Sequence, residues 1–304
     1  MTHRLSTQAY ESAADYLRTQ GRTLERALFA YEMTGAPLDD VYAALAAYQN
    51  PDGGFGHALE PDLRLSASSV ICTTIAFQHL RALGTPADHP LVTAACGFLK
   101  ASYDADQRNW SNVPPFVDDA PHAPWWTFRD QVRTDFANPR AEIVGYLYDY
   151  PQHFDAAWRD ALAQAALDHL RTSRGEIEMH DLLCYVRLVE TRALPDAIRH
   201  PLLDHLRHLV AHSVARDPKQ WQAYGLQPVA VVTTPGSPFA DLMGDALDTN
   251  LDFVIASQGA DGAWHPNFSW GGEHPEVWAQ AEREWSSVLT LANLRLLRAF
   301  GRID

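Results

Sequence analysis

One short pattern occurs twice in this chain of 304 residues, and it constrains the fold more than any other feature. Residues 49–55 read Gln-Asn-Pro-Asp-Gly-Gly-Phe, and residues 258–264 read Gln-Gly-Ala-Asp-Gly-Ala-Trp. Each run places Asp, Gly and an aromatic residue at the same offsets from its glutamine. Glycine and proline are too dense here for regular structure, so each run predicts a folded turn between helices. Two matches at identical offsets indicate an internal repeat.

Helical spacing of apolar residues dominates the rest of the chain, and strand patterning is nearly absent. Proline-bearing turns alternate with turns that carry an acidic residue followed by an aromatic one. The best strand-like run is 228–234, and the segment 103–137 is expected to be irregular. We expect helices at residues 6–18, 23–33, 38–48, 68–83, 85–101, 138–150, 154–172, 178–191, 195–215, 222–232, 239–257 and 284–300.

These helices pair into hairpins, which together predict an all-α fold of the α6/α6 toroid type. A helical hairpin cannot bury its apolar face alone and must stack on its neighbours. An open solenoid is the alternative, but the last expected helix is apolar on more than one side, which favours burial by ring closure. We therefore expect a single toroid domain over residues 1–304. In such a ring the acidic turns and the positive ends of the inner helices meet at one rim.

Charge and composition limit the classes of partner that we expect this protein to bind. The formal net charge of −14 would repel nucleic-acid phosphates, so we expect no nucleic-acid binding. No segment has the apolar length of a membrane span, and the first residues do not resemble a signal peptide. Three cysteines, far apart in sequence, favour a reduced, cytoplasmic chain. The sequence does not indicate the oligomeric state.

The repeated pattern is similar to the QW repeats of the terpenoid cyclase and protein prenyltransferase superfamily. The matching segments are Leu45-x-x-x-Gln49 with Asp-Gly-Gly-Phe55, and Val254-x-x-x-Gln258 with Asp-Gly-Ala-Trp. The stretches PHAPWW and HDLLCY also resemble those of uncharacterised bacterial proteins described as prenyltransferase-like. The resemblance implies an α/α toroid in which the glutamine and the aromatic residue of each repeat tie the turns together as scaffold.

The chain departs from the chemical motifs of that superfamily. Cyclases that protonate their substrate use DxDD, and here Phe116 stands at the relevant place before Asp118-Asp119. Ionising cyclases use DDxxD, and here the corresponding run ends in His122. The cluster around Cys184 does not match the prenyltransferase zinc spacing. We therefore expect no metal and no cofactor.

The first candidate site follows the first repeated turn. Glu60 and Asp62 are candidate catalytic carboxylates, one of which could act as a general acid when partly buried beside the other. His57 is a candidate ligand-binding residue on the same turn. The alternative is a structural loop that caps the next helix and forms a salt bridge with Arg64.

The second candidate site lies in the irregular segment. His122 is a candidate catalytic residue, and Asp119, Trp125 and Trp126 are candidate ligand contacts. Adjacent tryptophans beside a histidine suit a flat apolar ligand or a sugar. The alternative is a plug that covers one end of the ring, with both tryptophans buried.

Two further groups complete the candidates. His180 and Asp181 begin a helix, where His180 could contact the ligand and Asp181 could act as a catalytic acid. The alternative is that Asp181 caps the helix. Trp264 and Trp270 belong to a second aromatic loop and are candidate ligand contacts.

These observations predict a terpenoid cyclase-like or prenyltransferase-like protein that binds, and transforms, an apolar, isoprenoid-like small molecule in a central cavity. Carboxylates at the rim would serve as acid and base. One alternative is a cytoplasmic glycan hydrolase or lyase of the toroid type, with Glu60 or Asp62 opposed to Asp181. Another is a non-catalytic interaction domain. The lining of the cavity distinguishes the first two.

Overall fold

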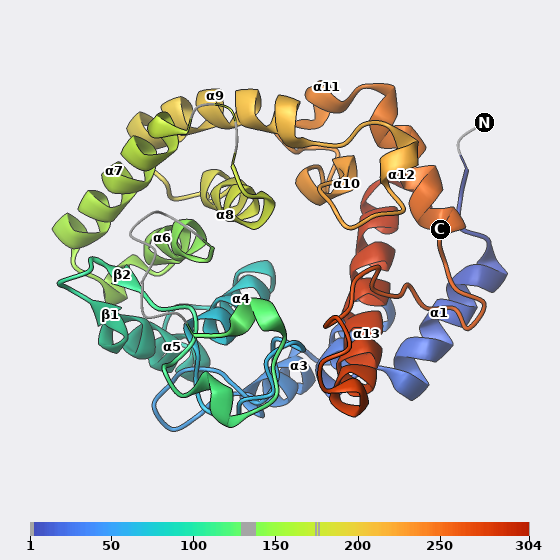
Figure 1. The fold of residues 1–304 in the computed structure, drawn as a ribbon, viewed down its shortest axis with the longest axis horizontal. Coiled ribbons are helices and arrows are strands. Elements are labelled where there is room, and N and C mark those ends of the chain that lie inside the picture. Colours follow the sequence, from blue (N-terminus) through green and yellow to red (C-terminus); the bar gives the residue numbers. More distant parts are fainter. Residues whose placement is uncertain (1–2, 129–137, 174, 176, 304) are drawn as a thin grey trace. The chain divides into compact units, whose positions relative to one another are not determined.

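The computed structural model describes residues 3–128, 138–173, 175 and 177–303, and these are mostly helical, with 60% helix and 3% strand (Figure 1). The all-α prediction is confirmed. The chain forms two compact units: unit 1 contains Met1–Ala47 and Val214–Asp304, and unit 2 contains Tyr48–Ser213. The toroid and the single domain stay predictions. Part of the segment expected to be irregular, 129–137, lies outside the described residues.

No helix of the described residues is long and apolar enough to cross a membrane.

Unit 1 is built from both ends of the sequence. Its helices are α1 (Thr7–Gln20), α2 (Thr23–Phe29, continued by a π-helical turn Ala30–Thr34), α3 (Leu38–Ala46), α10 (Pro228–Val231), α11 (Ala240–Met243), α12 (Asp245–Ala256) and α13 (Pro275–Ala299). The sequence predicts Ser6 and Thr23 as the N-caps of the first two helices and Gly35 as the end of the second. Ser6 and Gly35 take these roles, but Thr23 is the first residue of α2, whose N-cap is Arg22. The Ser6 hydroxyl accepts a hydrogen bond from the Ala9 N–H at 3.2 Å, and Gly35 ends the π-helical turn in the left-handed region with φ +75°.

Helix α1 packs on helix α13, so the N-terminal and C-terminal helices lie side by side (Figure 1). The Leu5 N–H donates to the Arg302 carbonyl at 2.8 Å. The Arg302 guanidinium, nearly buried, donates to Asp252 at 2.6 Å and to Asp248 at 2.8 Å. Together these bonds fix the two ends of the chain to each other within unit 1.

Unit 2 stacks helices in chain order, with one small hairpin of strands. Its elements are α4 (Val70–Ala82), α5 (Pro90–Ala101), β1 (Tyr103–Asp104), β2 (Asn109–Trp110), α6 (Arg140–Asp149), α7 (Ala156–Thr172), α8 (Met179–Val189) and α9 (Asp196–Ser213). The two strands pair antiparallel, with Tyr103 opposite Trp110.

Helix α6 lies in the core of unit 2, where it packs on α4, α7 and α8. Its one fully buried carboxylate, Glu142, receives a 2.6 Å hydrogen bond from Arg187 and a 3.2 Å bond from Gln78. A buried charge requires such partners, so this network is part of the core.

Four helix predictions are wrong in their boundaries. The helix expected at 85–101 starts at Pro90, with His89 as its N-cap. The helix expected at 222–232 is only the single turn α10, and because that turn is helical, the strand-like interpretation of 228–234 is also wrong. The helix expected at 239–257 is interrupted at Gly244, whose φ of +52° is outside the helical region. The last helix starts at Pro275 rather than at 284, since proline is favoured at the first helical position.

Candidate functional site

The repeated turn of unit 2, residues 49–55, is held by its glutamine and by the helix that follows. Gln49 Nε2 donates to the carbonyl of Gly53 at 3.0 Å and to that of Leu91 on α5 at 3.2 Å. The Phe55 N–H donates to Thr73 Oγ1 on α4 at 3.0 Å. We call residues 49–55 the unit 2 turn; it joins α4 and α5 through side-chain bonds.

The repeated turn of unit 1, residues 258–264, makes the same bonds in the same order. Gln258 Nε2 donates to the carbonyl of Gly262 at 2.8 Å and to that of Ala9 on α1 at 2.9 Å. The Trp264 N–H donates to Thr290 Oγ1 on α13 at 3.1 Å. This unit 1 turn therefore joins α13 and α1 as its counterpart joins α4 and α5, which agrees with the scaffold role that the sequence predicted.

The central glycines confirm the correspondence. Gly53 has a φ of +87° and Gly262 one of +89°. A Cβ on Gly53 would lie 2.3 Å from the Ala94 carbonyl oxygen, and one on Gly262 would lie 2.4 Å from that of Ser12. Both turns thus need glycine for the same two reasons, a left-handed backbone and a close helix.

The two modules differ next to these shared contacts. Tyr16 lies four residues after Ser12, which is the place that Phe98 takes after Ala94, so a hydroxyl is present only in unit 1. Helix α4 begins at Val70, close to Thr73, whereas α13 begins well before Thr290, at Pro275. The additional turns of α13 have no counterpart in α4.

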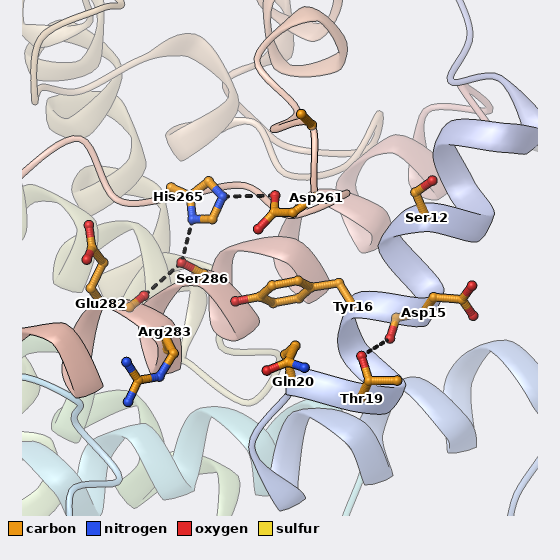
Figure 2. Close-up of a pocket in the computed structure, with 11 residues that line it drawn as sticks. Ser12, Asp15, Tyr16, Thr19, Gln20, Asp261, His265, Glu282, Arg283 and Ser286 are labelled. Atoms are coloured by element: carbon orange, nitrogen blue, oxygen red, sulfur yellow. Dashed lines mark hydrogen bonds and ion pairs between the residues drawn. The ribbon is translucent and has the colours of Figure 1, made fainter.

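A cleft of about 770 Å³ lies in unit 1 between α1, the unit 1 turn and the additional turns of α13 (Figure 2). Its volume is in the range of small-molecule sites. Ten of its eleven lining residues have polar side chains; the eleven are Ser12, Asp15, Tyr16, Thr19, Gln20, Ala260, Asp261, His265, Glu282, Arg283 and Ser286.

A histidine is fixed at both ring nitrogens on one side of this cleft. His265 Nε2 lies 3.1 Å from Asp261 Oδ1, and its Nδ1 lies 2.9 Å from Ser286 Oγ (Figure 2). The Ser286 hydroxyl donates to the Glu282 carbonyl at 2.7 Å, one turn earlier on α13. The Asp–His pair is the arrangement that orients an imidazole for acid–base chemistry.

Tyr16 lies beside this chain of hydrogen bonds in the cleft. Its ring meets that of His265 edge-on, with centroids 6.5 Å apart, and Figure 2 shows the ring pointing toward the α13 side chains. Burial raises the pKa of Tyr16 above its usual 10.0, and the negative charge of Asp261 adds to this, although the Ser286 hydroxyl opposes it. The phenol is therefore protonated at neutral pH and available as a hydrogen-bond donor.

Asp261 is held in its ionised form. Partial burial raises the pKa of its carboxyl group, but the hydrogen bonds from His265 and from the Ala263 N–H outweigh that effect and lower the pKa below 3.8. The carboxylate is therefore a permanent acceptor for the imidazole at neutral pH.

The carboxylates that sequence analysis singled out lie in unit 2. Glu60 and Asp62 are both buried, with 6% and 2% exposure. The Ala123 N–H donates to the Asp62 carbonyl at 2.8 Å, and Leu63 pairs with His122 in a β-bridge. The structure thus brings the Glu60–Asp62 loop and the His122 loop side by side.

Their neighbours are mostly at the surface. Asp119 is exposed, Trp125 is 47% exposed, and Trp126 has a buried indole nitrogen without a hydrogen-bond partner among the described residues. His57 Nε2 lies 2.9 Å from Asn50 Oδ1 in the loop itself. Trp125 does not fit the plug alternative, in which both tryptophans are buried.

His180 and Asp181 begin α8 as predicted, but Asp181 does not cap it. Glu178 is the cap: its carboxylate accepts from the His180 N–H at 2.8 Å and from the Asp181 N–H at 3.1 Å. Asp181 is buried and accepts instead from the Asn138 N–H at 2.6 Å. Glu178, an acidic residue about one turn earlier, takes the amides at the start of α8 that Asp181 was expected to cap. The sequence alone did not show which of the two acidic residues would be the cap.

Trp264 and Trp270 lie in unit 1 and are buried, with 3% and 1% exposure. The Trp264 indole N–H donates to the Val254 carbonyl at 2.7 Å. Trp270 packs against Trp278 with ring centroids 5.8 Å apart. These contacts account for both side chains by packing.

Sequence analysis missed the cleft residues Tyr16, Glu282, Arg283 and Ser286 as site candidates. One signal was available: His265 immediately follows the second repeated turn, where the first has Gly56. No cluster of three or more histidine, cysteine or acidic side chains able to hold a metal ion occurs in the described part of the chain.

The sequence matches no protein-family model, and no curated protein matches it significantly.

Proposed function

We propose that unit 1 binds a small polar molecule in the cleft and acts on it by acid–base chemistry. The observation that carries the proposal is that the cleft lies where the unit 1 module differs from its counterpart in unit 2. The shared turn accounts for the scaffold, and the scaffold in unit 2 is complete with Phe98 and a shorter α4. Folding alone therefore does not explain Tyr16, His265 and the additional turns of α13.

The lining supports the class of ligand. Hydroxyl, carboxylate, amide, imidazole and guanidinium groups line the cleft. Such a lining suits a ligand that carries hydroxyl or amino groups, because each can exchange its water for a protein partner. A sugar belongs to this class, and an isoprenoid chain does not.

The acid–base role is supported by the chain of bonds from Asp261 through His265 to Ser286, beside which Tyr16 lies with its ring centroid 6.5 Å from that of His265. The Tyr16 phenol can donate its proton to a bound molecule and take it back when the product leaves. His265, which is held by Asp261 and Ser286 next to the phenol, is in this scheme a positioning residue.

NMR titration tests the proposal through the histidine ring signals of the intact protein. Glucose, glucosamine, glycine and 4-aminobutanoate serve as polar probes, and farnesol serves as the apolar one. We expect at least one polar probe to shift the His265 ring signals and to leave those of His57, in unit 2, unchanged. Tyr16→Phe should weaken that binding. The proposal is wrong if only farnesol binds, or if every probe shifts His57 instead.

The isoprenoid function predicted from the sequence is the second candidate, and one observation favours it. Phe268 packs edge-on against Trp285 and against the exposed Tyr224, with ring centroids 5.6 Å and 5.3 Å apart. The buried indole nitrogen of Trp285 has no hydrogen-bond partner among the described residues. An apolar molecule with one hydroxyl would suit this cluster, and farnesol shifts confined to Trp285 would support that candidate.

A further inference from the structure

Two opposite charges face the cleft of unit 1 without a partner. Glu282 and Arg283 are consecutive residues of α13, both are exposed, and both line the cleft. The side chain of neither forms a hydrogen bond or an ion pair with the described residues. Consecutive residues on a helix do not face each other, so the two groups are poorly placed to neutralise one another.

The other charges of the lining are already engaged. Asp15 forms a 2.7 Å ion pair with Arg18, and Asp261 lies 3.1 Å from the ring of His265. A ligand that enters the cleft therefore meets one available carboxylate and one available guanidinium.

Resting on the proposed function, we propose that the ligand is a zwitterion whose ammonium group binds Glu282 and whose carboxylate binds Arg283. A guanidinium can hold a carboxylate through two parallel hydrogen bonds, and an ammonium is a compact donor for a carboxylate. Because Glu282 and Arg283 are consecutive on the helix, their side chains point in different directions. The ammonium and carboxylate groups of the ligand must therefore be separated by several bonds.

The Tyr16 hydroxyl is within electrostatic range of both proposed contacts, Arg283 and Glu282, and Figure 2 shows all three among the side chains that line the cleft. A zwitterion bound to both charges would therefore lie near the phenol. The two charged ends would set the register of the ligand, and thus the group on which Tyr16 acts.

A series of ω-amino acids tests the inference, from glycine to 6-aminohexanoate, with calorimetry or NMR on the full chain. Each is compared with the amine and the carboxylate of matched length, such as 4-aminobutanoate with butylamine and butanoate. We expect one chain length to bind about fivefold more tightly than either matched compound, as a single exposed ion pair contributes up to about that factor.

Two variants assign the ends of the ligand. Glu282→Gln should remove the advantage of the amino group and leave that of the carboxylate, and Arg283→Gln should do the reverse. Arg26→Gln, an exposed arginine of α2 outside the cleft, is the matched control and should change neither. All three side chains are exposed, so the fold should tolerate the changes, and circular dichroism checks this.

The outcomes separate this inference from the function on which it rests. If glucose shifts His265 and the amino acids gain nothing over the matched amines and carboxylates, the zwitterion is wrong and the polar site stands. If no polar probe shifts His265, both are wrong. Loss of binding in Arg26→Gln as well would also overturn the inference, since it would indicate a general effect of charge.

Discussion

The two repeated turns share a framework and differ in what is bonded to their aspartate. In unit 2, Asp52 Oδ1 accepts from the Ser68 hydroxyl at 2.7 Å, on the chain that leads into α4. In unit 1 that place is taken by the additional turns of α13, and Asp261 holds His265 at the edge of a cleft. Both aspartates are exposed, so the two modules differ in the partner of this carboxylate.

This difference separates structural positions from positions available for function. Both aspartates accept a hydrogen bond inside their own turn, from the Gly54 N–H at 3.0 Å and the Ala263 N–H at 3.2 Å. The aspartate is thus required by the turn itself. What unit 1 adds is the histidine beside it and the tyrosine opposite, neither of which the turn needs.

The largest expected effect tests whether the turns are equivalent. Gly53→Ala and Gly262→Ala should each lower the free energy of unfolding by about 4 kcal/mol, through the left-handed φ and the helix carbonyl within 2.4 Å. Gly84→Ala is the control, because its φ of +62° is also left-handed but nothing lies within 4 Å of its Cβ. It should lower that free energy by about 1 kcal/mol. Urea unfolding measures all three variants. If Gly84→Ala lost as much stability as the two turn variants, the close-packing argument would be wrong.

Gly56 and His265 stand at the same place after the two turns and should respond in opposite ways. A Cβ on Gly56 would lie 2.2 Å from the Ala67 carbonyl oxygen, so Gly56→Ala should lower the free energy of unfolding by about 3 kcal/mol. His265→Ala should lower it by less than about 1 kcal/mol, since the ring is exposed, but should abolish ligand binding. A large loss of stability in His265→Ala would mean that the cleft is scaffold.

The threonines that receive the aromatic N–H bonds should behave alike. Thr73→Val and Thr290→Val keep the shape but leave the N–H of Phe55 or Trp264 without its buried acceptor. Each should lower the free energy of unfolding by about 2 kcal/mol. Thr74→Val is the control, because the hydroxyl of Thr74 donates to the Ile71 carbonyl of its own helix. The two turns would not be equivalent if the stability losses of Thr73→Val and Thr290→Val differed from each other by more than either differs from the loss of Thr74→Val.

Much of the framework was predictable because its signals are local. Ser6 and Gly35 mark helix ends by the chemistry of their own side chains and backbone, and both act as the sequence indicated. The repeated turn was found because its glutamine, aspartate, glycine and aromatic residue lie within seven consecutive residues. The start of α13 was missed because the prediction used only the apolar pattern at 284–300, although Pro275 stands where a helix can begin.

The cleft was not predictable because its walls come from opposite ends of the sequence. Tyr16 is on α1 and Ser286 on α13, and no spacing connects them. Only the observation that Gln258 reaches Ala9 where Gln49 reaches Leu91 shows that α1 completes the last module. The predicted candidates Glu60 and Asp62 were chosen from local composition, which does not reveal that both are buried.

Tyr16 tests the comparison with a smaller change in stability. Since Phe98 takes the same place in unit 2, Tyr16→Phe should lower the free energy of unfolding by no more than about 1 kcal/mol, because it keeps the ring that packs against His265. Binding of the polar probe should weaken clearly in the same variant. Phe98→Tyr is the reciprocal control and should create no binding in unit 2. Unchanged binding in Tyr16→Phe would remove the phenol from the site.

The smallest expected effect is the pH dependence that His265 gives to Asp261. Partial burial raises the pKa of Asp261, but the bonds from His265 and Ala263 lower it below 3.8 in the folded protein. A folded-state pKa below the unfolded-state value of about 3.9 stabilises the fold above that pH, and the contribution is lost as the pH falls through the folded-state pKa.

His265→Ala should raise the pKa of Asp261 and reduce this pH-dependent contribution to stability by less than about 1 kcal/mol, because the pair is exposed to solvent. NMR titration of the carboxyl carbons measures the change, and Glu178, whose pKa is lowered by its own bond to His180, should stay as it was. An unchanged pKa of Asp261 would mean that His265 does not contribute to it, and that the bond from the Ala263 N–H is sufficient to lower it.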